Sequence, residues 1–246
     1  MWIKICGNTN REDVHLAASL GADAIGFVFA PSPRQVSPTQ ARVIARDLPA
    51  SVERIGVFHT LPPREIIEAV EEAGLTGIQL HGAFDADLVH NLHNAFAHRV
   101  TLTQTVHWDI RPDALPPLRS VQQQLRCVQK VPGIARVLID SRLGSIIGGT
   151  GTPFDWNAAR SAFAADLSQL NLIVAGGLRP ENVEDAITSL DPWGVDVSSG
   201  VESAPGRKDP QKLEAFLRKA SSTSTSKSDT SNPARPSPPS GNSSYP

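Results

Sequence analysis

Two glycine-containing turns near the C-terminal end of the chain have the composition of a phosphate-binding site. Ala175-Gly176-Gly177-Leu178 follows the apolar run Leu172–Val174, and Ser198-Ser199-Gly200-Val201-Glu202 follows Gly194–Val197. Because glycine has no Cβ atom, backbone N–H groups at such turns approach an anion closely. One such turn is an ordinary connection between a strand and a helix. Two turns at this spacing predict a site for a phosphate group.

Four further residues have side chains suited to acid–base chemistry or anion binding: Cys6, Arg34, His81 and Asp140. Each also has an ordinary structural explanation when it is taken singly. A cysteine is most often a small buried hydrophobic residue, and an arginine in a loop is usually solvated. A histidine can simply end a strand, and an aspartate can cap the next element. Their significance therefore depends on whether the fold brings them together.

Short apolar runs alternate with amphipathic stretches along the chain, which predicts eight strand–helix units. The expected strands are Ile3–Cys6, Ala24–Val28, Arg54–Phe58, Gly77–Leu80, Val100–Thr105, Val137–Asp140, Leu172–Ala175 and Val195–Ser198. The expected helices are Arg11–Leu20, Thr39–Asp47, Pro63–Ala73, Asp85–Phe96, Ser120–Lys130, Phe154–Ala164, Glu181–Leu190 and Pro210–Lys219. This pattern predicts an α/β fold, a (β/α)8 TIM barrel. An open doubly wound sheet is the alternative, although no G-x-G-x-x-G sequence follows the first strand.

The composition indicates a globular protein that acts on a small molecule. Of the 246 residues, 40% are hydrophobic and 20% are charged, and the net charge of −2 argues against nucleic-acid or membrane partners. No apolar run approaches the length of a membrane-spanning helix, and the N-terminus lacks the apolar stretch of a signal peptide. Two cysteines do not form a disulfide framework, so we expect a cytoplasmic location.

Two segments depart from the regular pattern. Asp109–Pro117 contains three prolines and is expected to be a loop. Residues 221–246 are rich in Ser, Thr and Pro, and such a segment buries too little apolar surface to offset its ordering entropy. We therefore expect a single catalytic domain over residues 1–220 and a disordered tail over 221–246.

Side-chain alternation along the strands predicts which residues face the barrel interior. Ile3 and Ile5 must face the helices, so Lys4 and Cys6 should point inward. By the same reasoning Gln79 and His81 face inward on the fourth strand, Asp140 is in phase with Leu138, and Asp196 is in phase with Ser198. The polar residues thus gather toward the C-terminal ends of the strands, where barrel enzymes place their active sites.

At this level of detail the chain resembles the phosphoribosylanthranilate isomerase family of tryptophan biosynthesis. The matching segments are Lys4–Gly7, Gly21–Phe27, Ser32–Arg34, Gly56–Phe58, Gln79–Gly82, Asp140, Gly148–Gly151, Phe154–Trp156, Ala175–Leu178, Pro180–Val183, Asp196–Glu202 and Gly206–Asp209. They extend from Met1 to about Ala220. Residues 106–135 show little of the family signature, and the tail lies outside it.

The resemblance implies an Amadori rearrangement of N-(5′-phosphoribosyl)anthranilate to 1-(2-carboxyphenylamino)-1-deoxyribulose 5-phosphate. The strand-1 cysteine, Cys6, would be the base, and the strand-6 aspartate, Asp140, would be the acid. Acid–base chemistry of this kind needs no metal and no redox cofactor. The site would have to lower the pKa of the thiol and raise that of the carboxyl group. Lys4 is a candidate for stabilising the thiolate.

The resemblance also implies the substrate contacts. Arg34 would pair with the anthranilate carboxylate, while Gln79, His81 and Asp196 would orient the sugar hydroxyls. The phosphate would lie against Gly149, Gly177, Ser199 and Gly200, and the loop Gly148–Gly151 would close over the substrate.

Other functions compete with this interpretation. A ribulose-phosphate epimerase would need His and Asp metal ligands at several strand ends, which the sequence does not disclose. A histidine-pathway isomerase typically has an aspartate at the position of Cys6. A third alternative is a non-catalytic barrel that serves as a scaffold. The sequence leaves the oligomeric state open between a monomer and a homodimer.

Overall fold

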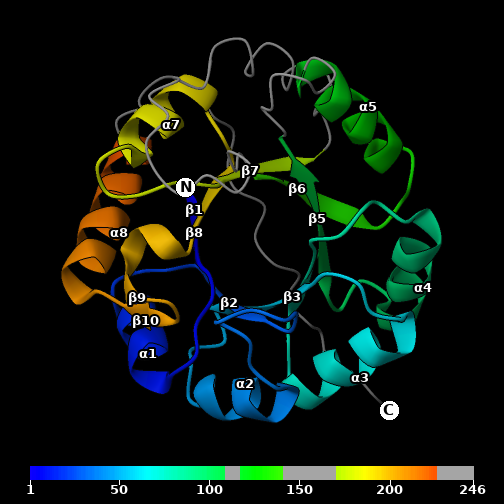
Figure 1. Ribbon diagram of the computed structural model, residues 1–246, viewed down its shortest axis with the longest axis horizontal. Coiled ribbons are helices and arrows are strands. Elements are labelled where there is room, and N and C mark those ends of the chain that lie inside the picture. The colour runs from blue at the N-terminus through cyan, green and yellow to red at the C-terminus, as the bar shows by residue number, and fades with distance from the viewer. Residues whose placement is uncertain (109–116, 141–169, 226–246) are drawn as a thin grey trace, which may run out of the picture.

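A closed barrel of eight parallel strands, in the order in which they occur in the chain, forms the centre of the molecule. The computed structural model describes residues 1–108, 117–140 and 170–225. Its helices surround the strands (Figure 1). The predicted α/β class and the (β/α)8 barrel are confirmed, and the open doubly wound sheet is excluded.

The strands agree with the predicted ones to within a few residues at each end. They are β1 Trp2–Ile5, β2 Ala24–Val28, β3 Glu53–Phe58, β4 Gly77–Leu80, β5 Thr101–His107, β6 Ile134–Asp140, β7 Asn171–Ala175 and β8 Gly194–Val197. β1 pairs with β2 on one side and with β8 on the other, which closes the barrel. After β8 the chain forms the short helix η1, Ser199–Val201, and a small hairpin of β9, Glu202–Ala204, and β10, Arg207–Lys208.

The described helices are α1 Arg11–Ser19, α2 Pro38–Ile44, α3 Pro63–Ala73, α4 Ala86–Phe96, α5 Pro117–Gln129, α7 Val183–Leu190 and α8 Pro210–Thr225. The predicted helix Phe154–Ala164 lies outside the described residues. Local signals begin several helices, as where Ser37 and Gln40 form a capping box at α2. Because α8 continues to Thr225, the boundary expected at residue 220 falls inside a helix. Residues 226–246 of the expected tail lie outside the described ranges.

Two apolar clusters divide the core as the alternation predicted. The larger one, between strands and helices, contains Ile3, Ile5, Ile78 and Leu80. The smaller one consists of inward-facing residues, namely Trp2, Ala24, Ile55, Leu138, Ile173 and Ala175. Side chains on alternate positions of each strand therefore fill the interior, which leaves the polar residues near the C-terminal ends of the strands to line a site.

A polar and aromatic cluster occupies the opposite, N-terminal end of the barrel. Arg136 donates two hydrogen bonds to Glu53, of 2.7 and 2.8 Å, and Trp2 Nε1 donates a third, of 3.0 Å. The guanidinium carbon of Arg136 lies 4.7 Å from the ring centroid of Trp2 and 4.8 Å from that of Trp193. Such contacts stabilise the barrel far from the candidate site.

Among the described helices, none is both long and apolar enough to cross a membrane.

Candidate active site

Cys6 lies directly after β1, and its thiol is buried next to the inward-facing Lys4. Its backbone N–H donates a 2.8 Å hydrogen bond to the carbonyl oxygen of Val197, which fixes it against the end of β8. Gly26 on β2 makes room for both side chains, because a Cβ atom there would lie 2.7 Å from Cys6 Sγ and 2.9 Å from Lys4 Cε. The expected inward orientation of Lys4 and Cys6 is therefore observed.

Burial raises the pKa of the Cys6 thiol, and the positive charges of Lys4 and Lys208 only partly oppose this effect. The direction is opposite to the lowering that a base active near neutral pH requires. Lys4 itself stays protonated: burial acts to lower its pKa, but Asp196 and Cys6 raise the pKa of Lys4 above its ordinary value. A thiolate formed at Cys6 would thus have a permanent positive charge beside it.

A layer of buried polar side chains lies across the barrel around Lys4. Its ammonium donates hydrogen bonds of 2.8 Å to Gln79 Oε1 and 3.1 Å to Asp196 Oδ2. Gln79 Nε2 in turn lies 3.3 Å from Thr105 Oγ1. The predicted residues Gln79 and Asp196 therefore lie in one layer, where both accept hydrogen bonds from Lys4. Within the described part of the chain, Asp196 Oδ1 accepts no hydrogen bond, so it is the atom of this layer that is left to accept one from a ligand.

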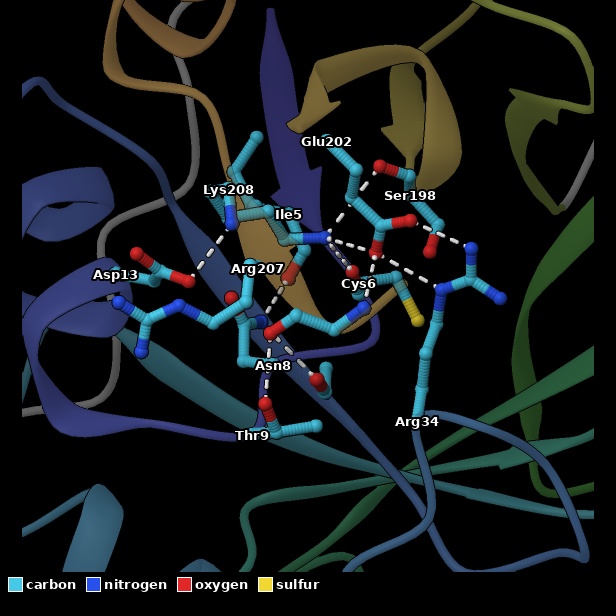
Figure 2. Close-up of polar contacts among 12 residues, drawn as sticks. Ile5, Cys6, Asn8, Thr9, Asp13, Arg34, Ser198, Glu202, Arg207 and Lys208 are labelled. Carbon is cyan, nitrogen blue, oxygen red and sulfur yellow. Dashed lines mark hydrogen bonds and ion pairs between the residues drawn. The ribbon is translucent and has the colours of Figure 1, made fainter. Parts of the chain in front are cut away.

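Arg34, which belongs to the loop between β2 and α2, forms a bidentate ion pair with Glu202. Nε donates to Oε1 at 2.8 Å and Nη2 donates to Oε2 at 2.5 Å (Figure 2). Gly7 has a φ of 73°, and a Cβ atom on it would lie 2.6 Å from Arg34 Cδ, so glycine is needed where the arginine stem passes. The arginine predicted to bind a carboxylate is already bound to one from its own chain.

Lys208 joins the ends of β1 and β8 and was not identified from the sequence. Its completely buried ammonium donates to the carbonyl oxygens of Cys6, at 2.6 Å, and Ser198, at 3.4 Å. The third donor bonds Glu202 Oε1 at 3.1 Å (Figure 2). Burial lowers the pKa of Lys208, against the opposing effect of Glu202. Glu202 and Lys208 lie in the short strands of the hairpin that follows η1, where alternation gives no signal. Both stand in segments that match the family, but neither was assigned a role from the sequence.

His81 and Asp140, at the ends of β4 and β6, come together as predicted, and His107 at the end of β5 joins them. His81 Nε2 lies 3.9 Å from Asp140 Oδ2, and His107 donates Nε2–H to the carbonyl oxygen of His81 at 2.9 Å. The three side chains offer ligand-type atoms within 4.8 Å of one another. The epimerase alternative requires metal-binding groups of histidine and aspartate, and this is one such group. It was not recognised from the sequence. The predicted β5 ended at Thr105, two residues short of His107.

The two glycine turns lie after β7 and β8. Gly176 and Gly177 have φ values of 88° and 64°, which glycine adopts without steric cost. A Cβ atom on Gly200 would collide with the carbonyl oxygen of Leu178, so the second turn approaches the first because residue 200 is glycine. No acceptor in the described ranges receives a hydrogen bond from the backbone N–H of Gly177, Ser199 or Gly200. These N–H groups can bind an anion. Gly149 and the loop Gly148–Gly151 lie outside the described residues.

Comparisons with known proteins point to one enzyme family over nearly the whole length of the barrel. The family model of N-(5′-phosphoribosyl)anthranilate (PRA) isomerase matches residues 3–219. The N-(5′-phosphoribosyl)anthranilate isomerase of Rubrobacter xylanophilus is 37% identical over 225 residues, covering 89% of this chain and 98% of the relative. The protein of the same name from Geobacter sulfurreducens is 39% identical over 219 residues, covering 89% and 97%.

Two crystal structures extend this similarity to the fold. The phosphoribosyl anthranilate isomerase of Thermotoga maritima superimposes with a TM-score of 0.75 at 35% identity, covering 90% of this chain and 99% of that one. A phosphoribosyl anthranilate isomerase in complex with reduced 1-(o-carboxyphenylamino)-1-deoxyribulose 5-phosphate gives a TM-score of 0.72 at 33% identity, with the same coverage. The family model, the relatives and the solved structures agree: the chain belongs to the N-(5′-phosphoribosyl)anthranilate isomerase family.

Proposed function

We propose that this barrel catalyses the Amadori rearrangement of N-(5′-phosphoribosyl)anthranilate, with Cys6 as the general base and Asp140 as the general acid. Membership of the family makes the protein an isomerase of tryptophan biosynthesis. The observation that carries the residue roles is the placement of a thiol beside a charged lysine at the end of β1 and of a buried carboxyl group at the end of β6. Both face the barrel mouth.

The chemistry requires one proton donor and one proton acceptor. Protonation of the ring oxygen by Asp140 opens the furanose ring, and the nitrogen lone pair forms the C1′ Schiff base. The Cys6 thiolate then removes the proton from C2′, and the C–H electrons form the enolamine. Addition of a proton to C1′ and loss of the proton of the C2′ hydroxyl group then give the ketone at C2′. Positioned groups of this type contribute about 10²–10⁴-fold each.

Two nearby lysines, Lys4 and Lys208, support the role of Cys6 as a base, although the thiol is buried. A buried thiol resists ionisation, but both lysines favour the thiolate. Lys4 lies on β1, two residues before Cys6, and Asp196 holds its ammonium in the barrel interior. The base is thus expected to work with a raised pKa, and the reaction should accelerate as the pH rises above neutral.

The remaining contacts bind the two ends of the substrate. Backbone N–H groups of Gly177, Ser199 and Gly200 would hold the phosphate, with Gly149 from the undescribed segment as a further contact. Arg34 would hold the anthranilate carboxylate through the part of its guanidinium that Glu202 does not occupy. Asp196 Oδ1 and His81 would bind the sugar hydroxyls, and Gln79 would act mainly by holding Lys4.

The wider organisation is also proposed. The catalytic domain would end after Thr225, where α8 ends, rather than at residue 220. A cytoplasmic location is supported by the two cysteines, Cys6 and Cys127, which are both free thiols. Either a monomer or a homodimer is compatible with a complete set of site residues on one chain.

A direct assay tests the reaction. The purified full chain should consume N-(5′-phosphoribosyl)anthranilate, followed by the loss of its fluorescence. It should leave ribulose 5-phosphate unchanged, with or without added divalent metal, since the epimerase alternative would act on that sugar. Absence of turnover of the anthranilate compound, or epimerisation of the sugar phosphate, would overturn the proposal.

A further inference from the structure

The ion pair between Arg34 and Glu202 uses only one edge of the guanidinium. The Nε–H and one Nη2–H bind Glu202, which occupies two of the five donors of the group. Within the described residues, Nη1 has no hydrogen-bond partner, and the Arg34 side chain stays 23% exposed while that of Glu202 is 5% exposed. The edge formed by Nη1 and the second Nη2–H is therefore directed away from the protein carboxylate.

Glu202 is held more firmly than the arginine that it binds. Besides the two bonds from Arg34, it accepts hydrogen bonds from Lys208 Nζ at 3.1 Å and from the backbone N–H of Gly206 at 3.2 Å. Despite burial, the bonds from Arg34 and the charge of Lys208 hold the pKa of Glu202 below its ordinary value. Two cations and one anion leave a net charge of +1 beside Cys6, which favours an anionic ligand.

From this geometry we infer that Glu202 is a positioning residue for substrate recognition: it fixes the Nε–Nη2 edge of Arg34 so that the Nη1–Nη2 edge meets the carboxylate of the substrate. The inference rests on the proposed function, because it takes the anthranilate carboxylate as the ligand of Arg34. A guanidinium on a flexible stem loses rotamer freedom when it binds. Glu202 imposes that order before the substrate arrives.

The convergence of distant segments supports positioning over simple charge neutralisation. Lys208 and the Gly206 N–H already compensate the charge of Glu202, so stability alone does not require an arginine from the β2–α2 loop. Gly7 nevertheless adopts a left-handed conformation beneath the Arg34 stem. The side chains meet next to the thiol of Cys6 (Figure 2). A carboxylate bound at the free edge would therefore be placed relative to the base.

Binding of two ligands tests the inference without relying on turnover. The first is reduced 1-(o-carboxyphenylamino)-1-deoxyribulose 5-phosphate, and the second is the same compound made from aniline, which lacks only the carboxylate. Calorimetry on Glu202→Gln should show the first bound at least about tenfold more weakly than by the wild type, with the second unchanged within about twofold. The amide replaces an acceptor by a donor that faces Arg34. Glu12→Gln, at an exposed glutamate, is the matched control and should alter neither affinity.

A second variant keeps the test decisive if Glu202→Gln does not fold. Glu202→Asp retains the negative charge, but its carboxylate is one methylene group shorter and does not reach the Nε–Nη2 edge of Arg34, so it should show the same selective loss. Equal weakening of both ligands, or no weakening of either, would overturn the inference alone. Wild-type protein that binds neither ligand would overturn the proposed function and the inference together.

Discussion

An arginine and a glutamate form a bidentate pair at each end of this barrel, and the two pairs differ in what covers them. At the N-terminal end, Arg136 binds Glu53 and contacts two tryptophan rings. At the C-terminal end, Arg34 binds Glu202, but one edge of its guanidinium is uncovered. The same interaction is thus part of the scaffold where aromatic rings cover it, and part of a binding site where an edge is left for a ligand.

The chemistry at the C-terminal end should respond most strongly to loss of the acid. Asp140→Asn removes the proton donor while it keeps the size of the side chain. We expect kcat to fall by about 10²–10⁴-fold with KM little changed, because proton transfer acts only in the transition state. Steady-state kinetics checks this. A rise in KM with normal kcat would assign Asp140 to binding instead.

Loss of Arg34 should weaken substrate binding and leave the fold intact. In Arg34→Ala, Lys208 and the Gly206 N–H still compensate Glu202, so we expect little change in the free energy of unfolding. KM should rise by about 10–100-fold, since charged hydrogen bonds to the carboxylate are lost in both ground and transition states. A kcat defect at normal KM would contradict this assignment.

Loss of Arg136 should have the reverse effect. Arg136→Met removes the ion pair and the contacts with Trp2 and Trp193, and it leaves Glu53 partly buried without its cation. We expect the free energy of unfolding to fall by about 1–3 kcal/mol, with kcat and KM unchanged. Urea unfolding measures the first quantity. If Arg34→Ala destabilised the protein as much as Arg136→Met, the contrast between the two ends would fail.

The pH dependence should reflect the buried thiol. Because burial raises the pKa of Cys6, the thiolate fraction increases through the alkaline range, so kcat/KM should increase between about pH 7 and about pH 9. The raised pKa also contributes stability below the ordinary thiol pKa, and this contribution is lost as the pH rises through the pKa of the folded protein. If kcat/KM stayed constant over this range, the rate would not depend on ionisation of a Cys6 thiol with a raised pKa, and the prediction would be wrong.

Removal of residues 226–246 should have the smallest effect. Neither arginine pair involves these residues, and their Ser-, Thr- and Pro-rich composition gives little apolar surface to bury. We expect Tm, kcat and KM to stay at their wild-type values when the chain ends at Thr225. A large fall in any of them would show that the segment packs on the barrel.

Strand periodicity was sufficient to place the residues that lie inside regular elements. Alternation about Ile3 and Ile5 put Lys4 and Cys6 in the interior, and the same reasoning placed Gln79 and Asp196, whose side chains the structure joins through Lys4. The pairing itself was not predictable, because it depends on the stagger of the strands. The sequence therefore identified the members of the polar layer but not the hydrogen bonds that Gln79 and Asp196 accept from Lys4.

Two of the residues that were missed lie where strand alternation gives no signal. Glu202 and Lys208 follow β8 in a 3₁₀ turn and a short hairpin, and Glu202 meets Arg34 across 168 positions of sequence. The pKa of Cys6 is raised because the thiol is buried, and the degree of burial could not be predicted from the residue type alone. His107 was missed because the predicted strand ended early; extending the alternation through Thr103 and Thr105 would have placed it at the barrel mouth.

The turnover number of Cys6→Ser, measured beside Cys127→Ser, tests the assignment of the base most directly. Cys127 is the other free cysteine and lies exposed on α5, so its replacement controls for the loss of a thiol as such. We predict that kcat of Cys6→Ser falls by about 10²–10⁴-fold at unchanged Tm, while Cys127→Ser keeps the wild-type rate. A Cys6→Ser enzyme that turns over N-(5′-phosphoribosyl)anthranilate at a near wild-type rate would contradict the role of Cys6 as the base.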